Sequence, residues 1–215
     1  MGVLVSGCGS DAPASGSRSP GPIRSAPADP SAAADPGRAK VLQIRDVKAV
    51  MPDAAALPGW RETSGSLVTK DRLLCQTVVP NGCRTTVAMG TSKFLRGEKM
   101  SKTGGEISFT LYSCTSERTA HELFAELTLS GSKTRLPGSL GDEQAAVHTT
   151  LSTGGRSVAI ASTKIRAGTT ILWVTAAGAE QHTTQQRTRA AAQLFHDRTE
   201  QAKTGEKPTT NAHID

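Results

Sequence analysis

The chain has 215 residues and a formal net charge of +6, with two Trp, one Tyr and four Phe. This length suggests one domain with appendages, and no run approaches the roughly 18 consecutive apolar residues of a membrane-spanning helix. The basic residues are scattered rather than clustered among aromatics, so we expect no nucleic-acid partner.

The first eight residues end in Val5-Ser6-Gly7-Cys8. An aliphatic residue, two small residues and a cysteine form the pattern read by bacterial lipoprotein processing, in which the thiol receives diacylglycerol. Only seven residues precede Cys8 and none is basic, whereas a signal peptide needs a basic segment and a longer apolar one. We therefore expect residues 1–8 to be the end of a lipoprotein signal peptide with a lipidated Cys8. The alternative is a cytosolic protein with a chance cysteine.

Residues 9–40 follow as a tether. Ala, Ser, Pro and Gly occupy 24 of the 31 positions from 9 to 39. Such a segment cannot bury enough apolar surface to offset the entropy of ordering it. We expect a disordered chain with an r.m.s. span of about 30 Å, which carries a single domain of residues 41–202 away from the membrane.

The domain begins with weak signals. Val41, Ile44, Val47 and Val50 recur at helical spacing and predict a short helix before Pro52. Trp60 follows a Pro-Gly turn and is expected to cap the core from a loop. Residues 61–74 are mostly polar and predict no clear element.

Cys75 and Cys83 flank a turn-like segment. In an oxidising compartment this near pair is the expected disulfide, which leaves Cys114 free or paired between chains. The spacing is not that of a zinc site and no histidine lies close by, so we expect no metal and no cofactor.

In the rest of the chain, alternation of apolar and polar residues predicts five strands, and apolar residues at helical spacing predict two helices. The predicted strands cover residues 85–90, 106–112, 145–151, 157–165 and 170–176, with a hairpin turn at 166–168. The helices run from Thr115 or Ser116 towards Gly131, and from Thr183 to Gln201, and residues 203–215 form a flexible tail. The fold class is therefore α+β, a mostly antiparallel sheet of about five strands with two helices packed on one face.

The sheet face away from the helices offers a candidate binding site. If the helices cover Ile107, Phe109 and Leu111, the alternating residues point to the open side. We expect Thr110, Tyr112, Trp173, Thr175 and His148 to gather there. Hydroxyls around two aromatics suit a small polar ligand or a glycan. The alternative is an ordinary half-exposed sheet face with surface aromatics, or Trp173 packed beneath Trp60.

Catalysis has one candidate nucleophile. Cys114 lies between a strand and a helix N-terminus, where thiol pKa values fall, and His121 or His148 would be its base. A leftover cysteine at a strand end is more often a buried small hydrophobe, so we expect no catalytic residues.

Several of these motifs resemble a known group. The box at Cys8, the tether, Pro58-Gly59-Trp60, the cysteines 75 and 83, Leu140-Gly141-Asp142-Glu143 and the segment from Arg166 to Trp173 are similar to actinobacterial secreted lipoproteins. Many of these resemble the extracellular sensor domain of PknH-type serine/threonine kinases. The resemblance spans roughly residues 45–202 and implies an extracytoplasmic α+β domain with a ligand cleft and no catalysis. The sensors carry two disulfides, whereas the three cysteines left here allow one internal bridge.

The sequence therefore predicts a lipid-anchored, non-catalytic ligand-binding or sensor-like module on the extracytoplasmic side of the cell membrane. Its partners would be the membrane, through the anchor, and a small polar ligand, glycan or envelope protein. An envelope protein–protein interaction module is the alternative function, followed by a small hydrolase.

Overall fold

The computed structural model describes residues 40–70, 82–97, 104–135, 138–153 and 156–215. All of them belong to the second of the two units into which the chain divides, Gly37–Asp215. The predicted anchor at Cys8, the tether and Cys75 lie outside the described residues, and so does the side chain of Cys83. The anchor and the Cys75–Cys83 disulfide therefore stay predictions.

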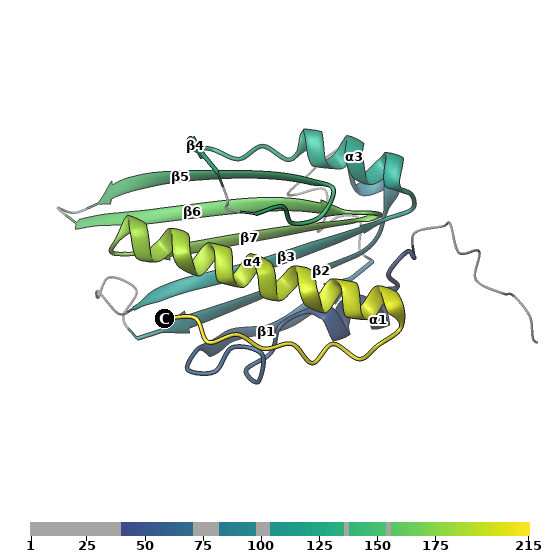
Figure 1. Ribbon diagram of the computed structural model, residues 1–215, viewed down its shortest axis with the longest axis horizontal. Coiled ribbons are helices and arrows are strands. Elements are labelled where there is room, and N and C mark those ends of the chain that lie inside the picture. Colours follow the sequence, from purple (N-terminus) through teal and green to yellow (C-terminus); the bar gives the residue numbers. More distant parts are fainter. Residues whose placement is uncertain (1–39, 71–81, 98–103, 136–137, 154–155) are drawn as a thin grey trace, which may run out of the picture. The chain divides into compact units, whose positions relative to one another are not determined.

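The described strands form one antiparallel sheet in the order β1-β2-β3-β7-β6-β5-β4 (Figure 1). Their bounds are β1 Arg61–Thr69, β2 Thr86–Arg96, β3 Gly105–Cys114, β4 Ser132–Thr134, β5 Glu143–Thr153, β6 Arg156–Ala167 and β7 Thr170–Gly178. The sheet has seven strands rather than the five expected, because β1 and β4 were not predicted. The hairpin between β6 and β7 is confirmed, and Gly168 adopts a φ of 55° in its two-residue loop.

Within the described residues, three α-helices and one 3-10 helix accompany the sheet: α1 Ile44–Val50, η1 Gly82–Thr85, α3 Glu117–Glu126 and α4 Gln181–Thr204. Ser116 is the N-cap of α3, and its Oγ accepts a hydrogen bond of 3.2 Å from the backbone N–H of Thr119. The helix ends at Glu126, before the expected stop at Gly131. Gly205 ends α4 in the left-handed conformation, with a φ of 86°.

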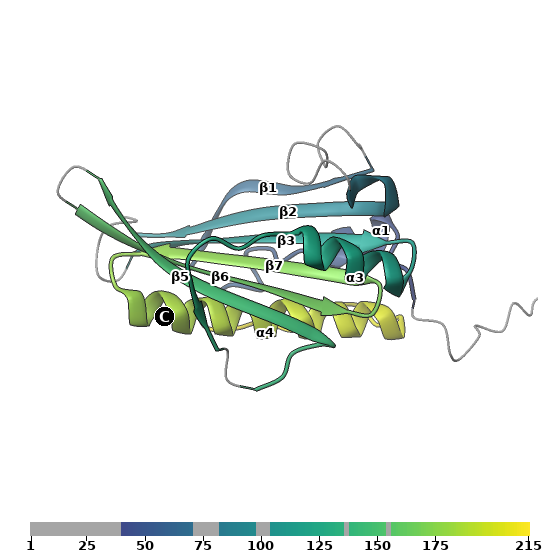
Figure 2. The same cartoon turned by 90° about the horizontal axis from the view of Figure 1, so that it is seen from above.

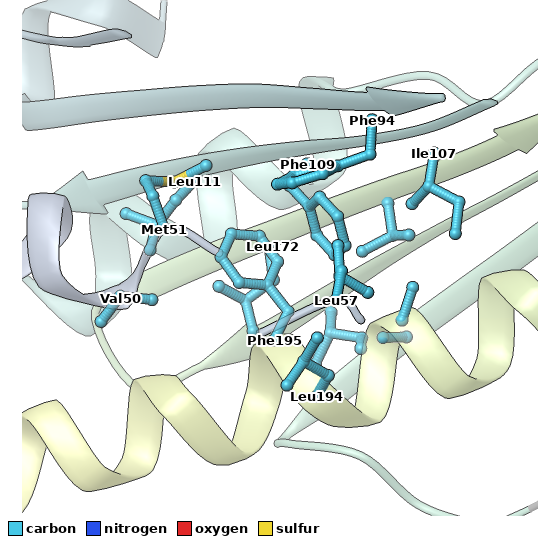
Figure 3. Close-up of a cluster of buried hydrophobic side chains, with 14 of the residues drawn as sticks. Val50, Met51, Leu57, Phe94, Ile107, Phe109, Leu111, Leu172, Leu194 and Phe195 are labelled. Carbon is cyan, nitrogen blue, oxygen red and sulfur yellow. The ribbon is translucent and has the colours of Figure 1, made fainter. Parts of the chain in front are cut away.

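The main core lies between the sheet and the helices α1 and α4 (Figures 1 and 2). Alternate residues of β3 and β7 point into it, and Phe109 is its centre (Figure 3). The Phe109 ring meets the rings of Phe94 and Phe195 edge to face, at centroid distances of 5.9 and 5.2 Å. Trp60 is 4% exposed and joins this core from a loop, as predicted.

Helix α3 packs on the opposite face of the sheet. Its buried residues Ala120, Leu123 and Phe124 form a second cluster with Tyr112, Ile171 and other residues of that face. The prediction of two helices on one face is therefore wrong, because the apolar stripe of α3 meets the strand residues that alternate with those of the main core. Lys164 on β6 holds the end of this helix: its Nζ donates to the carbonyl oxygens of Phe124 and Leu127, the latter at 2.5 Å.

The C-terminal residues dock on the main-core side. Ile214 is 3% exposed within the main core, and the backbone N–H of Ala212 donates to the carbonyl of Ala56 at 3.0 Å. Residues 203–215 were expected to form a flexible tail, but they form an ordered segment. Although this segment is mostly polar, the buried side chain of Ile214 and hydrogen bonds from arginine side chains to its backbone carbonyls hold it on the domain.

Candidate functional site

A groove of about 270 Å³ lies beside the N-terminal half of α4. Ala146 on β5 and Ala161 on β6 form its floor, and Thr134 and Arg135 line it from the β4 side. From the helix it is lined by His182, Gln185, Gln186, Thr188 and Arg189. Figure 1 shows β5 between α4 and β4. Helix α4 packs mainly over β7 and β6, so the sheet beyond the helix is left open as a trough.

Small side chains form the floor of this trough. On the face of the sheet that bears α4, small residues occupy this part of β5 and β6: Ala146 pairs with Thr163, and Ala161 pairs with Ala176 of β7. Thr188 fixes the helix beside them, with its hydroxyl 3.2 Å from the carbonyl oxygen of Ala161. The missing side-chain volume above the two alanines becomes open space for a ligand.

The helix wall is polar and follows the helical repeat. His182, Gln186 and Arg189 are spaced i, i+4 and i+7 and so form one stripe of α4. The Gln186 side-chain amide donates a hydrogen bond of 3.0 Å to Nε2 of His182 when that nitrogen is unprotonated. Gln185 and Thr188 line the same wall.

Two arginine side chains place positive charge on opposite walls of the groove. Arg135 comes from the end of β4 and Arg189 from α4, and both side chains are exposed. None of the lining residues is Asp or Glu, and within the described ranges neither guanidinium has a hydrogen-bond or ion-pair partner. A second hollow of about 250 Å³ adjoins the groove and shares Thr134, Arg135 and Ala146 with it.

The predicted sheet-face site is partly assembled. Thr110 lies opposite Trp173 in the pairing of β3 with β7, and both are half-buried on the face that carries α3. Thr175 shares this face, and its hydroxyl is 3.0 Å from that of Ser162. These side chains therefore lie together on one face of the sheet.

Two predicted members do not fit that site. Tyr112 is on the expected face but is fully buried beneath α3, and burial raises the pKa of its phenol to about 12. His148 pairs with Ala161 and therefore lies on the opposite face, the one that carries α4. The expectation for His148 was wrong because consecutive small residues, Ala145 to Val147, hide the alternation of β5.

The candidate Cys–His pair is not assembled. Cys114 is fully buried in the cluster beneath α3, and desolvation raises the pKa of its thiol to about 12. No hydrogen bond joins it to His121 or His148 among the residues described. His121 instead contacts Glu143, with 2.8 Å between Nδ1 and Oε1.

Glu143 belongs to a surface charge cluster that attaches α3 to the sheet. Its carboxylate accepts hydrogen bonds from His121 and from Nε of Arg166, and Arg166 also pairs with Asp142 at 3.0 Å. The hydrogen bond from His121 is the main cause that lowers the pKa of Glu143, assisted by Arg166 and opposed by desolvation. We assign this cluster a structural role.

The described residues contain no group of three or more His, Cys, Asp or Glu side chains arranged to hold a metal ion. No helix in the same ranges combines the length and apolarity needed to cross a membrane.

The fold of the chain was compared with those of known proteins. No protein-family model and no curated protein matches the chain. The crystal structure of the extracellular domain of PknH from Mycobacterium tuberculosis matches with a TM-score of 0.38 and 8% sequence identity, covering 77% of this chain and 93% of that domain. A likeness this weak does not indicate a function, so the candidate site is inferred from the geometry of the groove alone.

The groove residues were not foreseen from the sequence. The stripe of His182, Gln186 and Arg189 is visible in the helical repeat. Its opposite wall was not, because Ser132–Thr134 is a three-residue strand within a polar stretch that predicts a loop.

Proposed function

We propose that this protein is a lipid-anchored, non-catalytic module on the extracytoplasmic side of the membrane, which binds a small polar ligand in the groove between α4 and β4. The groove is the observation that carries the binding function. It combines a concave apolar floor with convergent polar side chains, which is the usual composition of a ligand site. The anchor rests on the Val5-Ser6-Gly7-Cys8 box and the tether that follows it.

A non-catalytic role is favoured by the state of the candidate nucleophile. A thiol with a pKa of about 12 is protonated at neutral pH, and the thiolate is the reactive form. The part of the sheet that α3 leaves open supports the alternative of a protein-binding surface less well. Among the described residues, the exposed large apolar side chains are Leu67 on β1 and Leu151 on β5, which lie on strands towards opposite edges of the sheet and do not form one patch.

The anchor is tested by expressing the gene with its upstream sequence in its own host and measuring intact mass and membrane fractionation. A mature chain that begins at Cys8 and carries diacylglycerol supports the proposal. An unmodified chain in the cytoplasmic fraction contradicts it.

The binding role is tested by ¹H–¹⁵N NMR on the full chain with Cys8→Ser, which removes the acceptor thiol. The probes are neutral and charged monosaccharides and free amino acids. Binding in the groove predicts shifts of amides in β4, the middle of β5 and β6, and residues 182–189. Shifts confined to the region of Thr110 and Trp173 would instead assign binding to the sheet face.

A further inference from the structure

We infer that the groove selects an anionic sugar, either a sugar phosphate or a uronic acid, and that Arg135 and Arg189 are its charge-recognising residues. This inference rests on the proposed function and names the chemical class of its ligand.

The groove carries positive charge that no acidic lining residue compensates. Arg135 and Arg189 face one groove whose lining contains no acidic residue, and neither has an ion-pair or hydrogen-bond partner in the described ranges. Elsewhere, the buried Arg187 and Arg198 donate to backbone carbonyls, at 2.6 Å to Gly104 and 3.0 Å to Val50. Arg166 pairs with carboxylates. The two groove arginines thus keep donors free for a ligand.

The placement of these two arginines suits one bound anion. They reach the trough from opposite walls, α4 and the end of β4, with β5 between them. A guanidinium presents a planar fork of N–H donors that matches a phosphate or carboxylate. An anion above Ala146 and Ala161 would be approached by donors from two sides, which a single surface arginine does not provide.

The other lining side chains favour hydroxyl groups on the ligand. Thr134, Gln185, Gln186 and His182 supply donors and acceptors along both walls. The floor is made of alanine methyl groups, which suit the apolar edge of a sugar ring. A volume of about 270 Å³ accommodates one ring with its substituents. The adjoining hollow at Arg135 and Gln144 lets a longer ligand continue beyond the first unit.

The test compares glucose 6-phosphate, glucuronate and glucose by NMR titration of the full chain with Cys8→Ser. We expect both anionic probes to shift groove amides and glucose to bind at least about tenfold more weakly. Arg135→Gln and Arg189→Gln should each weaken binding of glucose 6-phosphate about tenfold, since each removes one charge-assisted contact. The double variant should lose measurable binding.

Matched controls separate local contacts from net charge. Arg45→Gln on α1 and Arg61→Gln on β1 remove exposed charges outside the groove, and they should leave the affinity within twofold. Arg189→Lys keeps the charge and should recover part of it. Thermal melting of all variants should match the wild-type chain, because every substituted side chain is exposed.

The possible failures can be told apart. If glucose binds the groove as tightly as the anions, or if the groove and control variants lose affinity equally, charge recognition is overturned and a neutral-ligand groove remains. If glucose 6-phosphate and glucuronate shift no groove amide, the inference is wrong. The neutral probes then decide whether the groove binds any ligand.

Discussion

The indole Nε1 of Trp60 donates a hydrogen bond of 2.8 Å to the carbonyl oxygen of Ile214. The two residues are 154 positions apart, so this contact attaches the end of the chain to the loop that precedes β1. The same carbonyl accepts a second hydrogen bond of 2.7 Å from Arg96 on β2. The C-terminal segment is thereby part of the folded domain.

Ile214→Ala should lower the free energy of unfolding by about 2–5 kcal/mol, the usual cost of truncating a buried aliphatic side chain. Ile214 is 3% exposed, whereas the neighbouring His213 is exposed. His213→Ala should therefore change stability by less than about 0.5 kcal/mol. Urea denaturation of both variants checks this, and equal stabilities would mean that the tail is not docked in solution.

Lys164→Met should destabilise α3. Removing the ammonium group relieves the desolvation that lowers the pKa of Lys164, but it leaves the carbonyls of Phe124 and Leu127 without their donor. An unsatisfied buried acceptor costs about 1–3 kcal/mol, and the favourable interaction of a cation with a helix C-terminus is lost as well. We expect the second effect to exceed the first.

Hydrogen exchange measures that outcome locally. Amides of residues 120–127 should exchange faster in Lys164→Met, while those in the middle of α4 should not change. Lys48→Met, an exposed substitution on α1, is the control. Unchanged protection of α3 would show that packing alone holds this helix.

The carboxylate of Glu143 should make stability depend on pH. Its pKa lies below the ordinary value of 4.5 because of hydrogen bonds from His121 and Arg166. A lowered carboxyl pKa stabilises the folded state above the unfolded-state pKa, and this contribution disappears as the pH falls through the folded-state pKa. Glu143→Gln should therefore cost about 1 kcal/mol at pH 7.

The difference between Glu143→Gln and the wild-type chain should shrink as the pH drops below 4.5, the ordinary pKa. Thermal melting between pH 7 and pH 3 measures it. Glu126→Gln, which removes an exposed carboxylate of α3, should show no comparable trend. A difference that persists at the lowest pH would assign the effect to packing instead of charge.

Cys114 should resist alkylation in the folded protein. Its thiol is fully buried and has a pKa of about 12. Iodoacetamide at pH 8 should leave the Cys114 peptide unmodified by mass spectrometry, and the same reagent in 6 M guanidinium chloride should modify it completely. Rapid labelling of the native chain would reopen a nucleophilic role.

The sequence predicts the elements whose pattern is local. Strand β3, the capped start of α3 at Ser116 and the hairpin at Gly168 all follow from neighbouring residues. Strand β1 was missed because it is an edge strand with mostly exposed polar side chains and two register shifts. Such a strand shows no apolar alternation from which to recognise it.

The candidate sites depended on information that is not local. The apolar stripe of α3 predicts that the helix packs, but not on which face, and so the covering of Tyr112 could not be foreseen. Lys164 hints that α3 covers this face, because it is a charged residue at an inward-facing position of β6. Its role becomes clear only once the carbonyls of Phe124 and Leu127 are known to lie above it.

The two edge strands of the sheet, β1 and β4, are poorly suited to pairing with strands of other molecules. Strand β1 is broken by two register shifts, and β4 is three residues long with Lys133 at its centre. Irregular, short and charged edge strands resist pairing with a strand from another molecule. Proteins tethered to a bilayer meet at high two-dimensional concentration, where a regular edge would nucleate aggregates. If the chain is anchored as proposed, these edge strands suit the domain to dense display on a lipid surface.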